Sequence, residues 1–294
     1  MQERKQLMHR IVSRRELAPE VYQVVVTAPL IAAERQPGQF VIVQVDEAWG
    51  ERIPLTIADA DITQGTITLI FQSVGRTTHL LAEKGVGESV PAILGPLGKP
   101  TKLERFGRVV CVGGGIGVAP LRPIAAALKE MGNHVTVVMG ARQRQLVILE
   151  PEMRAFADEV VVCTDDGSYG RKALVTEPLR ELCEAAPPPD CVVAIGPPIM
   201  MKFCAETTRP FGIKTIVSLN TIMIDGTGMC GGCRVTVGGE TRFVCVDGPE
   251  FDGHEVDFDN MIKRLRAYKP QEEAQHQAHH AAEACRLNAA LQKR

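Results

Sequence analysis

Three cysteines near the carboxyl end of the sequence have a spacing that suits a metal ion or an iron-sulfur cluster. Cys230, Cys233 and Cys245 follow the pattern C-x2-C-x11-C within IDGTGMCGGCRVTVGGETRFVCVDG. Glycines between the first two thiolates let backbone amides point at inorganic sulfides, and the predicted hairpin RVTVGGETRFVC returns the third cysteine. Three thiolates need a fourth ligand, for which Asp225 and His254 are the candidates.

Two kinds of centre fit this ligand set. A [2Fe-2S] cluster would provide the one-electron acceptor that a flavin needs, whereas a zinc ion would be structural. We favour the cluster because a flavin site is predicted upstream. A nucleotide-binding scaffold with a zinc knuckle is the alternative. Residues 221–258 are too few and too irregular for a core of their own, so the bound group would supply the missing cohesion.

A glycine-rich turn in the middle of the chain is typical of a nucleotide site. Its glycines follow a predicted strand and open a predicted helix, where backbone amides can approach a pyrophosphate. They are Gly113, Gly114, Gly115 and Gly117. Val118 breaks the G-x-G-x-x-G fingerprint, so a tight turn without a ligand is the alternative. Gly196 and Pro197, in the later turn IGPPIMM, would leave backbone close to a nicotinamide ring.

Charged side chains after two other predicted strands could select the nucleotide. Asp165 and Asp166 in CTDDGSYGRK could bind ribose hydroxyls, which would favour NAD. Arg142 and Arg144 in GARQRQ could instead bind a 2′-phosphate. Either pair could equally cap helices or form salt bridges, so the choice between the two nucleotides stays open.

The segment ERIPLTIAD predicts a strand that could hold a flavin. Arg52 could bind a flavin phosphate while Thr56, four residues later, faces the isoalloxazine ring, and Thr56 is the candidate catalytic residue. A second phosphate could bind at SVGRTTHLL, where amides and hydroxyls stand before a predicted helix. The residues concerned are Gly75, Thr77 and Thr78. The strand pattern alone is weak, because surface strands often carry arginines.

The elements that would position these residues fall into two patterns. Residues 1–105 alternate short β-branched runs with turn residues, which predicts an antiparallel β-barrel that binds FAD, with one helical stretch at HLLAEKG (79–85). Residues 106–220 repeat strand, turn and helix, and their nearly continuous apolar strands predict a doubly wound, parallel-sheet α/β domain that binds NAD(H). TIVSLN (215–220) is expected to complete that sheet. The cluster segment, residues 221–258, and a helical tail, residues 259–294, follow.

Composition places the chain among ordinary globular proteins. It has 294 residues, of which 45% are hydrophobic and 23% charged, and this excludes a disordered or fibrous chain and favours about two domains. A net charge of −2 and 4% aromatic residues predict neither nucleic acid nor membrane as a partner. Five isolated cysteines are expected to be buried in a reducing cytoplasm. They are Cys111, Cys163, Cys183, Cys191 and Cys204.

The tail beyond residue 271 is rich in alanine, glutamine and histidine. His276, His279 and His280 have the spacing of a helical metal chelate, but a solvated helix face is the favoured interpretation. Cys285 stands alone there.

These motifs together resemble the ferredoxin-NADP reductase superfamily, and the resemblance covers about residues 1–269. RIPLTIAD is similar to the flavin motif R-x-P-[LFY]-[ST] of that superfamily, and GGGIGVAP, CTDDGSYGRK and AIGPPIMMK are similar to its nucleotide loops. The resemblance implies FAD contacts from Arg52, Pro54, Leu55 and Thr56.

Within that superfamily, VSLNTIMIDGTGMCGGCRVTVGG most resembles the small subunits of electron-bifurcating NADH-dependent ferredoxin:NADP oxidoreductases, also called sulfide dehydrogenase β-type subunits. The resemblance implies a cluster held by Asp225, Cys230, Cys233 and Cys245. The related electron-transfer subunit of dihydroorotate dehydrogenase, which has cysteine at the first ligand position, is the alternative. The resemblance also implies FAD, a [2Fe-2S] cluster, NAD(H) as substrate, and a larger FAD/[4Fe-4S] partner subunit.

Overall fold

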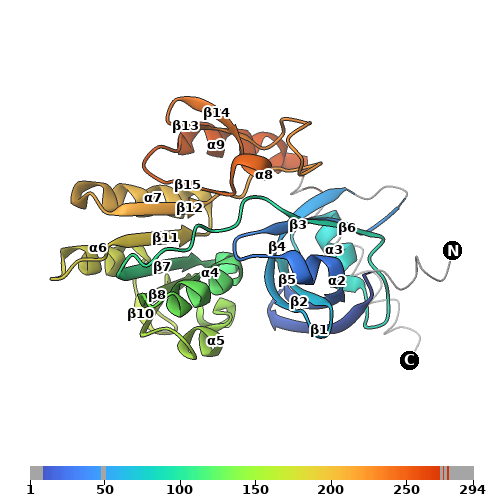
Figure 1. The fold of residues 1–294 in the computed structure, drawn as a ribbon, viewed down its shortest axis with the longest axis horizontal. Coiled ribbons are helices and arrows are strands. Elements are labelled where there is room, and N and C mark those ends of the chain that lie inside the picture. Colours follow the sequence, from blue (N-terminus) through green and yellow to red (C-terminus); the bar gives the residue numbers. More distant parts are fainter. Residues whose placement is uncertain (1–8, 48–50, 272–273, 275–276, 278–294) are drawn as a thin grey trace.

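The structure, a computed structural model, describes residues 9–47, 51–271, 274 and 277. A β-barrel and an α/β domain lie side by side, and the C-terminal segment lies over both (Figure 1). Residues 1–8 of the predicted barrel range, and the tail residues His276, His279, His280 and Cys285, lie outside the described residues.

Six antiparallel strands form the barrel, in the order β1-β2-β5-β4-β3-β6. They are β1 (Ile11–Ala18), β2 (Val21–Thr27), β3 (Phe40–Gln44), β4 (Arg52–Asp61), β5 (Thr66–Gln72) and β6 (Ala92–Leu97). Alternate residues such as Val24, Ile67 and Leu69 fill the interior. Hydrogen bonds from the Ile11 amide to the Glu88 carbonyl, 2.8 Å, and from Val90 to His9 join the start of β1 to the segment before β6.

Two helices accompany the barrel strands. The predicted helix is present as α3 (Arg76–Glu83), which begins three residues earlier than expected because the Thr78 hydroxyl accepts a hydrogen bond from the Gly75 amide at its start. The other, α2 (Pro29–Glu34), is absent from our prediction. Its proline stands in the first turn, where the missing amide hydrogen costs nothing.

The seven-stranded sheet of the α/β domain has the order β10-β9-β8-β7-β11-β12-β15. Its strands are β7 (Arg108–Gly114), β8 (His134–Ala141), β9 (Glu159–Thr164), β10 (Arg171–Lys172), β11 (Cys191–Ile195), β12 (Lys214–Ser218) and β15 (Glu250–Asp252). The helices are α4 (Val118–Glu130), α5 (Glu150–Arg154), α6 (Thr176–Glu184) and α7 (Pro198–Thr208). Chain order reverses between β7 and β11, which confirms the doubly wound prediction and creates a switch point at their carboxyl ends.

One detail of the sheet prediction is wrong. TIVSLN, found as β12, is not the last strand, because β15 pairs with it antiparallel through Val217 and Phe251. A strand from the cluster segment thus forms one edge of the nucleotide sheet. The five isolated cysteines are buried as predicted. No helix in the described residues is long and apolar enough to span a membrane.

The cluster segment, residues 221–258, contains the predicted hairpin and one short helix. They are β13 (Arg234–Val237), β14 (Glu240–Phe243) and α8 (Val244–Asp247). The helix α9 (Phe258–Leu265) and the 3-10 turn η4 (Arg266–Tyr268) begin the predicted helical tail. One hydrophobic core cluster joins Val235 and Val244 of this segment to Val217 of the sheet and to Phe40 of the barrel. The cohesion that we assigned to a bound group is therefore supplied in large part by a core shared with both domains.

Candidate cofactor sites

The loop that follows Met223 is wrapped around the carboxylate of Asp225. Asp225 Oδ2 accepts hydrogen bonds from the amides of Met229, 2.9 Å, and Cys230, 3.2 Å. Its Oδ1 lies 3.2 Å from Cys230 Sγ, and the Thr227 hydroxyl donates to Oδ2. Desolvation alone would raise the pKa of Asp225, but the hydrogen bonds from Cys230, Thr227 and Met229 outweigh it and lower the pKa to about 2. The group is an anion at neutral pH.

A second pair of ligand candidates lies in the core. Cys233 on the loop and Cys245 on α8 are both buried, and their sulfur atoms are 3.2 Å apart. Burial, and then the neighbouring Cys233 thiol, raise the pKa of Cys245 to about 12. Such thiols lose their protons only when a metal ion binds them.

The two pairs are neighbours but do not converge on one point. The amide of Gly228, in the Asp225 loop, donates to the sulfur of Cys245, so that loop lies against α8. Among the described residues, no three His, Cys, Asp or Glu side chains are grouped to hold one metal ion. Each iron of a [2Fe-2S] cluster takes two protein ligands, so a pair beside a pair fits that centre better than a single zinc ion.

The other candidate for the fourth ligand is engaged elsewhere. His254 Nε2 lies 2.9 Å from the hydroxyl of Thr208, and its carbonyl accepts from Arg209. The structure therefore brings Asp225, and not His254, to the cysteines.

The flavin candidates on β4 divide between two faces of the strand. Arg52, Pro54 and Thr56 alternate along one face, and Arg52 is exposed while Thr56 is partly buried opposite Phe40. Leu55 packs against the barrel core, so a flavin contact from this residue would come from its backbone.

The predicted second phosphate site is close to that strand. The buried Thr77 hydroxyl donates to Glu51, the residue before Arg52, at 3.1 Å. The Thr78 hydroxyl accepts from the amides of Val74 and Gly75, so it caps α3. Our sequence interpretation did not include a buried hydrogen bond of 2.7 Å between Ser73 and His79, which joins the end of β5 to α3. It was missed because neither residue belongs to a phosphate-binding pattern.

The four glycines of the nucleotide turn differ in what a Cβ atom would meet at their positions. A Cβ on Gly117 would meet the Ile195 carbonyl and lie 2.7 Å from Gly196, at the switch point. A Cβ on Gly114 would meet Met200, and one on Gly113 would lie 2.9 Å from Val118. Packing against backbone therefore requires glycine at Gly117, whereas a Cβ at Gly113 or Gly114 would need the neighbouring side chains to shift. Gly115 has φ +55°, and no neighbouring heavy atom lies within 4 Å of the Cβ position.

Open space at Gly115 continues into a shallow apolar hollow at the carboxyl ends of β7 and β8. Its lining is Gly115, Val118, Met139, Gly140, Ala141, Leu146, Val147 and Ile148. Sequence reasoning missed residues 146–148, although the apolar run after GARQRQ was a usable signal.

Some of the charged candidates near this hollow already contact residues of their own or a neighbouring loop. Asp166 accepts from the amide and hydroxyl of Ser168, at 2.9 and 2.6 Å, and these bonds lower its pKa. The Arg144 guanidinium stacks over Tyr169, 5.2 Å from the ring centre. The exposed Asp165 side chain has no hydrogen bond or ion pair with any described residue. Asp165 is therefore the better placed of the two aspartates for a ribose.

Comparisons with known proteins first define the class. Residues 111–206 match the family of the oxidoreductase NAD-binding domain, and residues 220–257 match the iron-sulfur cluster binding domain of dihydroorotate dehydrogenase B. With the flavin-binding type of barrel, these matches define an oxidoreductase of the ferredoxin-NADP reductase fold with sites for FAD, NAD(H) and an iron-sulfur cluster. They also favour iron-sulfur over zinc.

The particular family follows from full-length relatives. The chain is 47% identical to a dihydroorotate dehydrogenase B (NAD(+)) electron transfer subunit homolog of Thermotoga maritima, over 90% of this chain and 93% of the relative. It is 37% identical to the electron transfer subunit of Geobacillus thermodenitrificans, over 84% and 96%. The chain belongs to this family of electron-transfer subunits, as the motifs predicted.

One solved structure is similar over almost its full length. It was described for insights into flavin-based electron bifurcation through the NADH-dependent reduced ferredoxin-NADP oxidoreductase. It shares 45% identity, covers 92% of this chain and 97% of its own, and has a TM-score of 0.87.

Proposed function

We propose that this chain carries electrons between NAD(H), FAD and a [2Fe-2S] cluster, and exchanges them with a larger FAD/[4Fe-4S] subunit of an electron-bifurcating NADH-dependent ferredoxin:NADP oxidoreductase. The observation that carries the proposal is the arrangement of two pairs of side chains, Asp225 with Cys230 beside Cys233 with Cys245. The solved structure with 45% identity supports it.

In this proposal the nucleotide binds at the switch point and the flavin on β4. Gly115 and the packed glycines around it present backbone amides to the pyrophosphate, Gly196 and Pro197 leave room beside the nicotinamide, and Asp165 accepts from ribose. Arg52 neutralises a flavin phosphate while Thr56 faces the ring. The bound FAD supplies the exchange between two-electron and one-electron chemistry.

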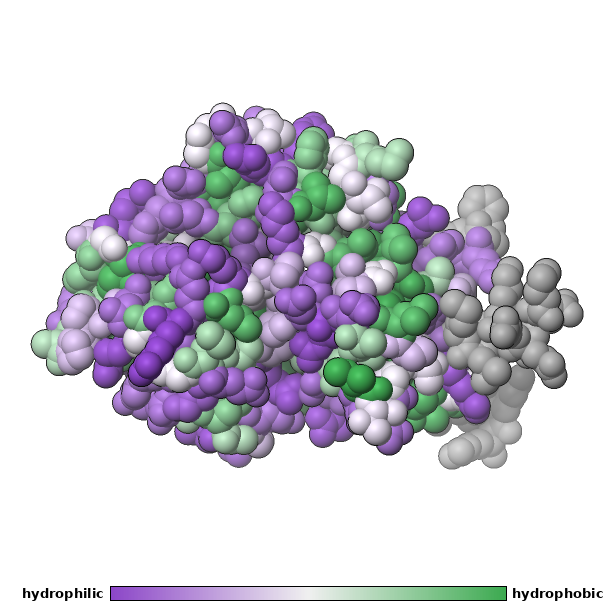
Figure 2. Space-filling model, viewed as in Figure 1, coloured by the Kyte–Doolittle hydropathy of each residue, from purple (hydrophilic) through white to green (hydrophobic). Residues whose placement is uncertain are grey.

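The partner would dock over the cluster segment. Cys230 is exposed there, and around it Met229, Ile224 and Val246 expose 88%, 53% and 38% of their surfaces. In Figure 2, hydrophobic and neutral surface gathers where the segment at the top of the view meets the barrel. Exposed apolar side chains beside a redox ligand suit a subunit interface through which electrons leave.

The second candidate function is that of an electron-transfer subunit for a dihydroorotate dehydrogenase, which the names of several relatives favour. Asp225 separates the two, because the resemblance assigns cysteine to that position in dihydroorotate dehydrogenase subunits. The identity of the co-purifying partner decides: a barrel dehydrogenase would support this second candidate.

Anaerobic purification followed by measurement of flavin, iron and acid-labile sulfide tests the proposed cofactors. We expect one FAD, with two irons and two sulfides per chain. NADH should bleach the flavin absorption. Zinc without sulfide, or a flavin that NADH does not bleach, would overturn the proposal.

A further inference from the structure

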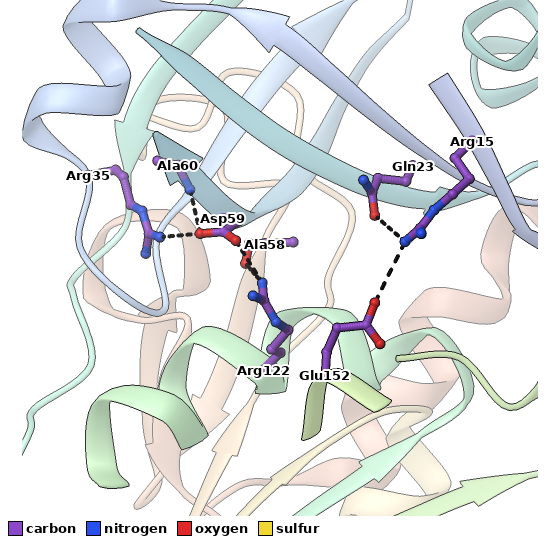
Figure 3. Close-up of polar contacts among 8 residues, drawn as sticks. All are labelled: Arg15, Gln23, Arg35, Ala58, Asp59, Ala60, Arg122 and Glu152. Carbon is purple, nitrogen blue, oxygen red and sulfur yellow. Dashed lines mark hydrogen bonds and ion pairs between the residues drawn. The ribbon is translucent and has the colours of Figure 1, made fainter. Parts of the chain in front are cut away.

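Asp59, near the end of β4, binds two arginines that come from different elements (Figure 3). Its Oδ2 accepts from Arg122 Nη1 of α4 at 2.9 Å, and its Oδ1 accepts from Arg35 Nη2, just after α2, at 3.4 Å. The amide of Ala60 also donates to Oδ1 at 2.9 Å, which orients the carboxylate. One carboxylate therefore joins the barrel to the nucleotide domain.

The contact is partly shielded from water. Arg35 and Arg122 expose 15% and 30% of their side chains, whereas Asp59 exposes 45%. Beneath it, the buried Ala58 shares a hydrophobic cluster with Leu121 of α4. Arg122 also reaches the Ala58 carbonyl at 3.5 Å. Charge-assisted bonds over a packed apolar contact hold two surfaces in a more defined geometry than an exposed ion pair does.

Each of the two residues in this ion pair is close in sequence to one of the two proposed cofactor sites. Asp59 follows Thr56 by three residues on the same strand. Arg122 follows Gly117 by five residues, in the helix that begins at the nucleotide turn. Thr56 and Asp59 lie on one continuous strand, although its pairing with β5 shifts register between Ile57 and Asp59, and Arg122 lies in the first two turns of α4. A shift at the ion pair would therefore move the backbone close to both sites.

We propose that Asp59 and Arg122, supported by Arg35, are positioning residues that set how closely the nicotinamide approaches the flavin. This inference rests on the proposed function. In the step concerned, a hydride leaves NADH, which becomes NAD+, and its two electrons and proton reduce the oxidised flavin. The rate of such a transfer depends steeply on alignment, and a displacement of about 1 Å costs about 100-fold.

Stopped-flow reduction of the anaerobic, FAD-loaded full chain by NADH tests the proposal. Asp59→Asn keeps the size of the side chain and removes its charge. We expect its flavin reduction at saturating NADH to be at least about tenfold slower. FAD content and the dissociation constant for NADH should stay within about twofold, since Asp59 is not among the proposed contacts of either ligand. If Asp59 only stabilised the fold, Asp59→Asn would not slow flavin reduction while leaving FAD content and the dissociation constant for NADH unchanged.

A second ion pair on the same boundary provides the control. Glu152 of α5 lies 3.7 Å from Arg15 of β1, and neither belongs to a proposed cofactor site (Figure 3). Glu152→Gln should leave the reduction rate within about twofold of the native value. Arg122→Gln should match Asp59→Asn, the double variant should be no slower than the slower single variant, and Arg122→Lys should lose less.

The outcomes separate the possible failures. Native rates of flavin reduction in both Asp59→Asn and Arg122→Gln would overturn the inference. So would a double variant whose loss of rate is the product of the two single losses, or a Glu152→Gln variant that is as slow as Asp59→Asn. If Asp59→Asn does not fold, the rates of flavin reduction in Arg122→Lys and Arg122→Gln are compared instead. A smaller loss in Arg122→Lys supports the inference, and native rates in both variants overturn it. A native chain that binds FAD but is not reduced by NADH would overturn the proposed function itself.

Discussion

The nucleotide turn and the cluster loop are both rich in glycine, but their glycines serve different purposes. In the turn, Gly113, Gly114 and Gly117 stand where any Cβ would collide with packed neighbours. In the loop, Gly228 and Gly231 have φ of +85° and +66°, so the backbone can fold around the Asp225 carboxylate. The turn is therefore shaped by the fold, whereas the loop is shaped by the side chain of Asp225. This difference predicts where substitutions damage the fold and where they damage only a site.

The largest effect is expected at the switch point. In Gly117→Ala the new methyl group meets the backbone of Ile195 and Gly196, which are held by the sheet and cannot yield. We expect a loss of about 3 kcal/mol in the free energy of unfolding, measured with urea. Gly75→Ala in the flavin-free chain is the control, because no heavy atom lies within 4 Å of that Cβ position. Gly75 is the N-cap of α3, where alanine is less favourable than glycine, so a loss of no more than about 1 kcal/mol is expected. Equal stability of the two variants would contradict the packing argument.

Asp225→Ala should damage the site and spare the fold. The loop loses its central acceptor and the cluster loses its proposed fourth ligand, so iron and sulfide in the purified protein should fall by about tenfold or more. The unfolding midpoint of the cluster-free chain should change little, because Val235 and Val244 keep the segment packed. Asp225→Cys should retain a cluster with a shifted potential and visible spectrum.

His254→Ala is the matched test of the other candidate ligand. Since His254 bonds Thr208 rather than a cysteine, iron content should be unchanged. Unaltered spectra in both Asp225 variants, together with iron loss in His254→Ala, would transfer the ligand role to His254.

The two halves of the ligand set should also differ from each other. Cys245→Ser places a hydroxyl in the core beside Cys233, so the cluster-free chain should lose about 1 kcal/mol in addition to losing the cluster. Cys230→Ser changes an exposed side chain, and its cluster-free stability should stay within about 0.5 kcal/mol. Calorimetry of the cluster-free variants distinguishes the two. Equal losses would show that the exposed half also supports the core.

The regular parts of the fold were predictable because local patterns determine them. Continuous apolar runs identified β7, β8, β9, β11 and β12, since a sheet covered on both faces needs them. β15 was missed because EFD is short and polar, and it becomes a strand only by pairing with β12 across more than 30 residues of chain. The shared core beneath the cluster segment was missed for the same reason, because Phe40 and Val244 meet only in three dimensions.

The candidate sites show the same limit. Motif spacing located the ligand set and the nucleotide turn, because their chemistry needs those residues close together in sequence. The assignment of individual ligands, nucleotide contacts and flavin contacts stays a prediction. Motif spacing could not predict the contacts of Asp59 with Arg35 and Arg122, since these contacts join three elements that share no motif. The apolar lining at residues 146–148 likewise depends on a loop folding back over β7 and β8.

The smallest effect is expected where the cluster segment is joined to the rest of the chain. Glu250 on β15 accepts a hydrogen bond of 2.5 Å from Thr101, in the connection that leads from the barrel to the nucleotide domain. Burial raises the pKa of Glu250 above its ordinary value of 4.5, and the Thr101 bond only partly opposes this. The folded chain therefore holds the proton more tightly than the unfolded chain, so this group contributes most stability below about pH 4.5 and loses it as the pH rises.

Glu250→Gln removes that dependence while keeping an acceptor for Thr101. The variant should be the more stable protein at pH 8, and the difference between the two urea midpoints should close as the pH falls towards 4. Thr101→Val removes the bond that favours the ionised form, so the stability of that variant should decline more steeply with pH than that of the native chain. Parallel midpoint curves from pH 4 to 8 would contradict a perturbed Glu250. The Thr101–Glu250 contact would then join the segment to the rest of the chain as an ordinary hydrogen bond with no dependence on pH.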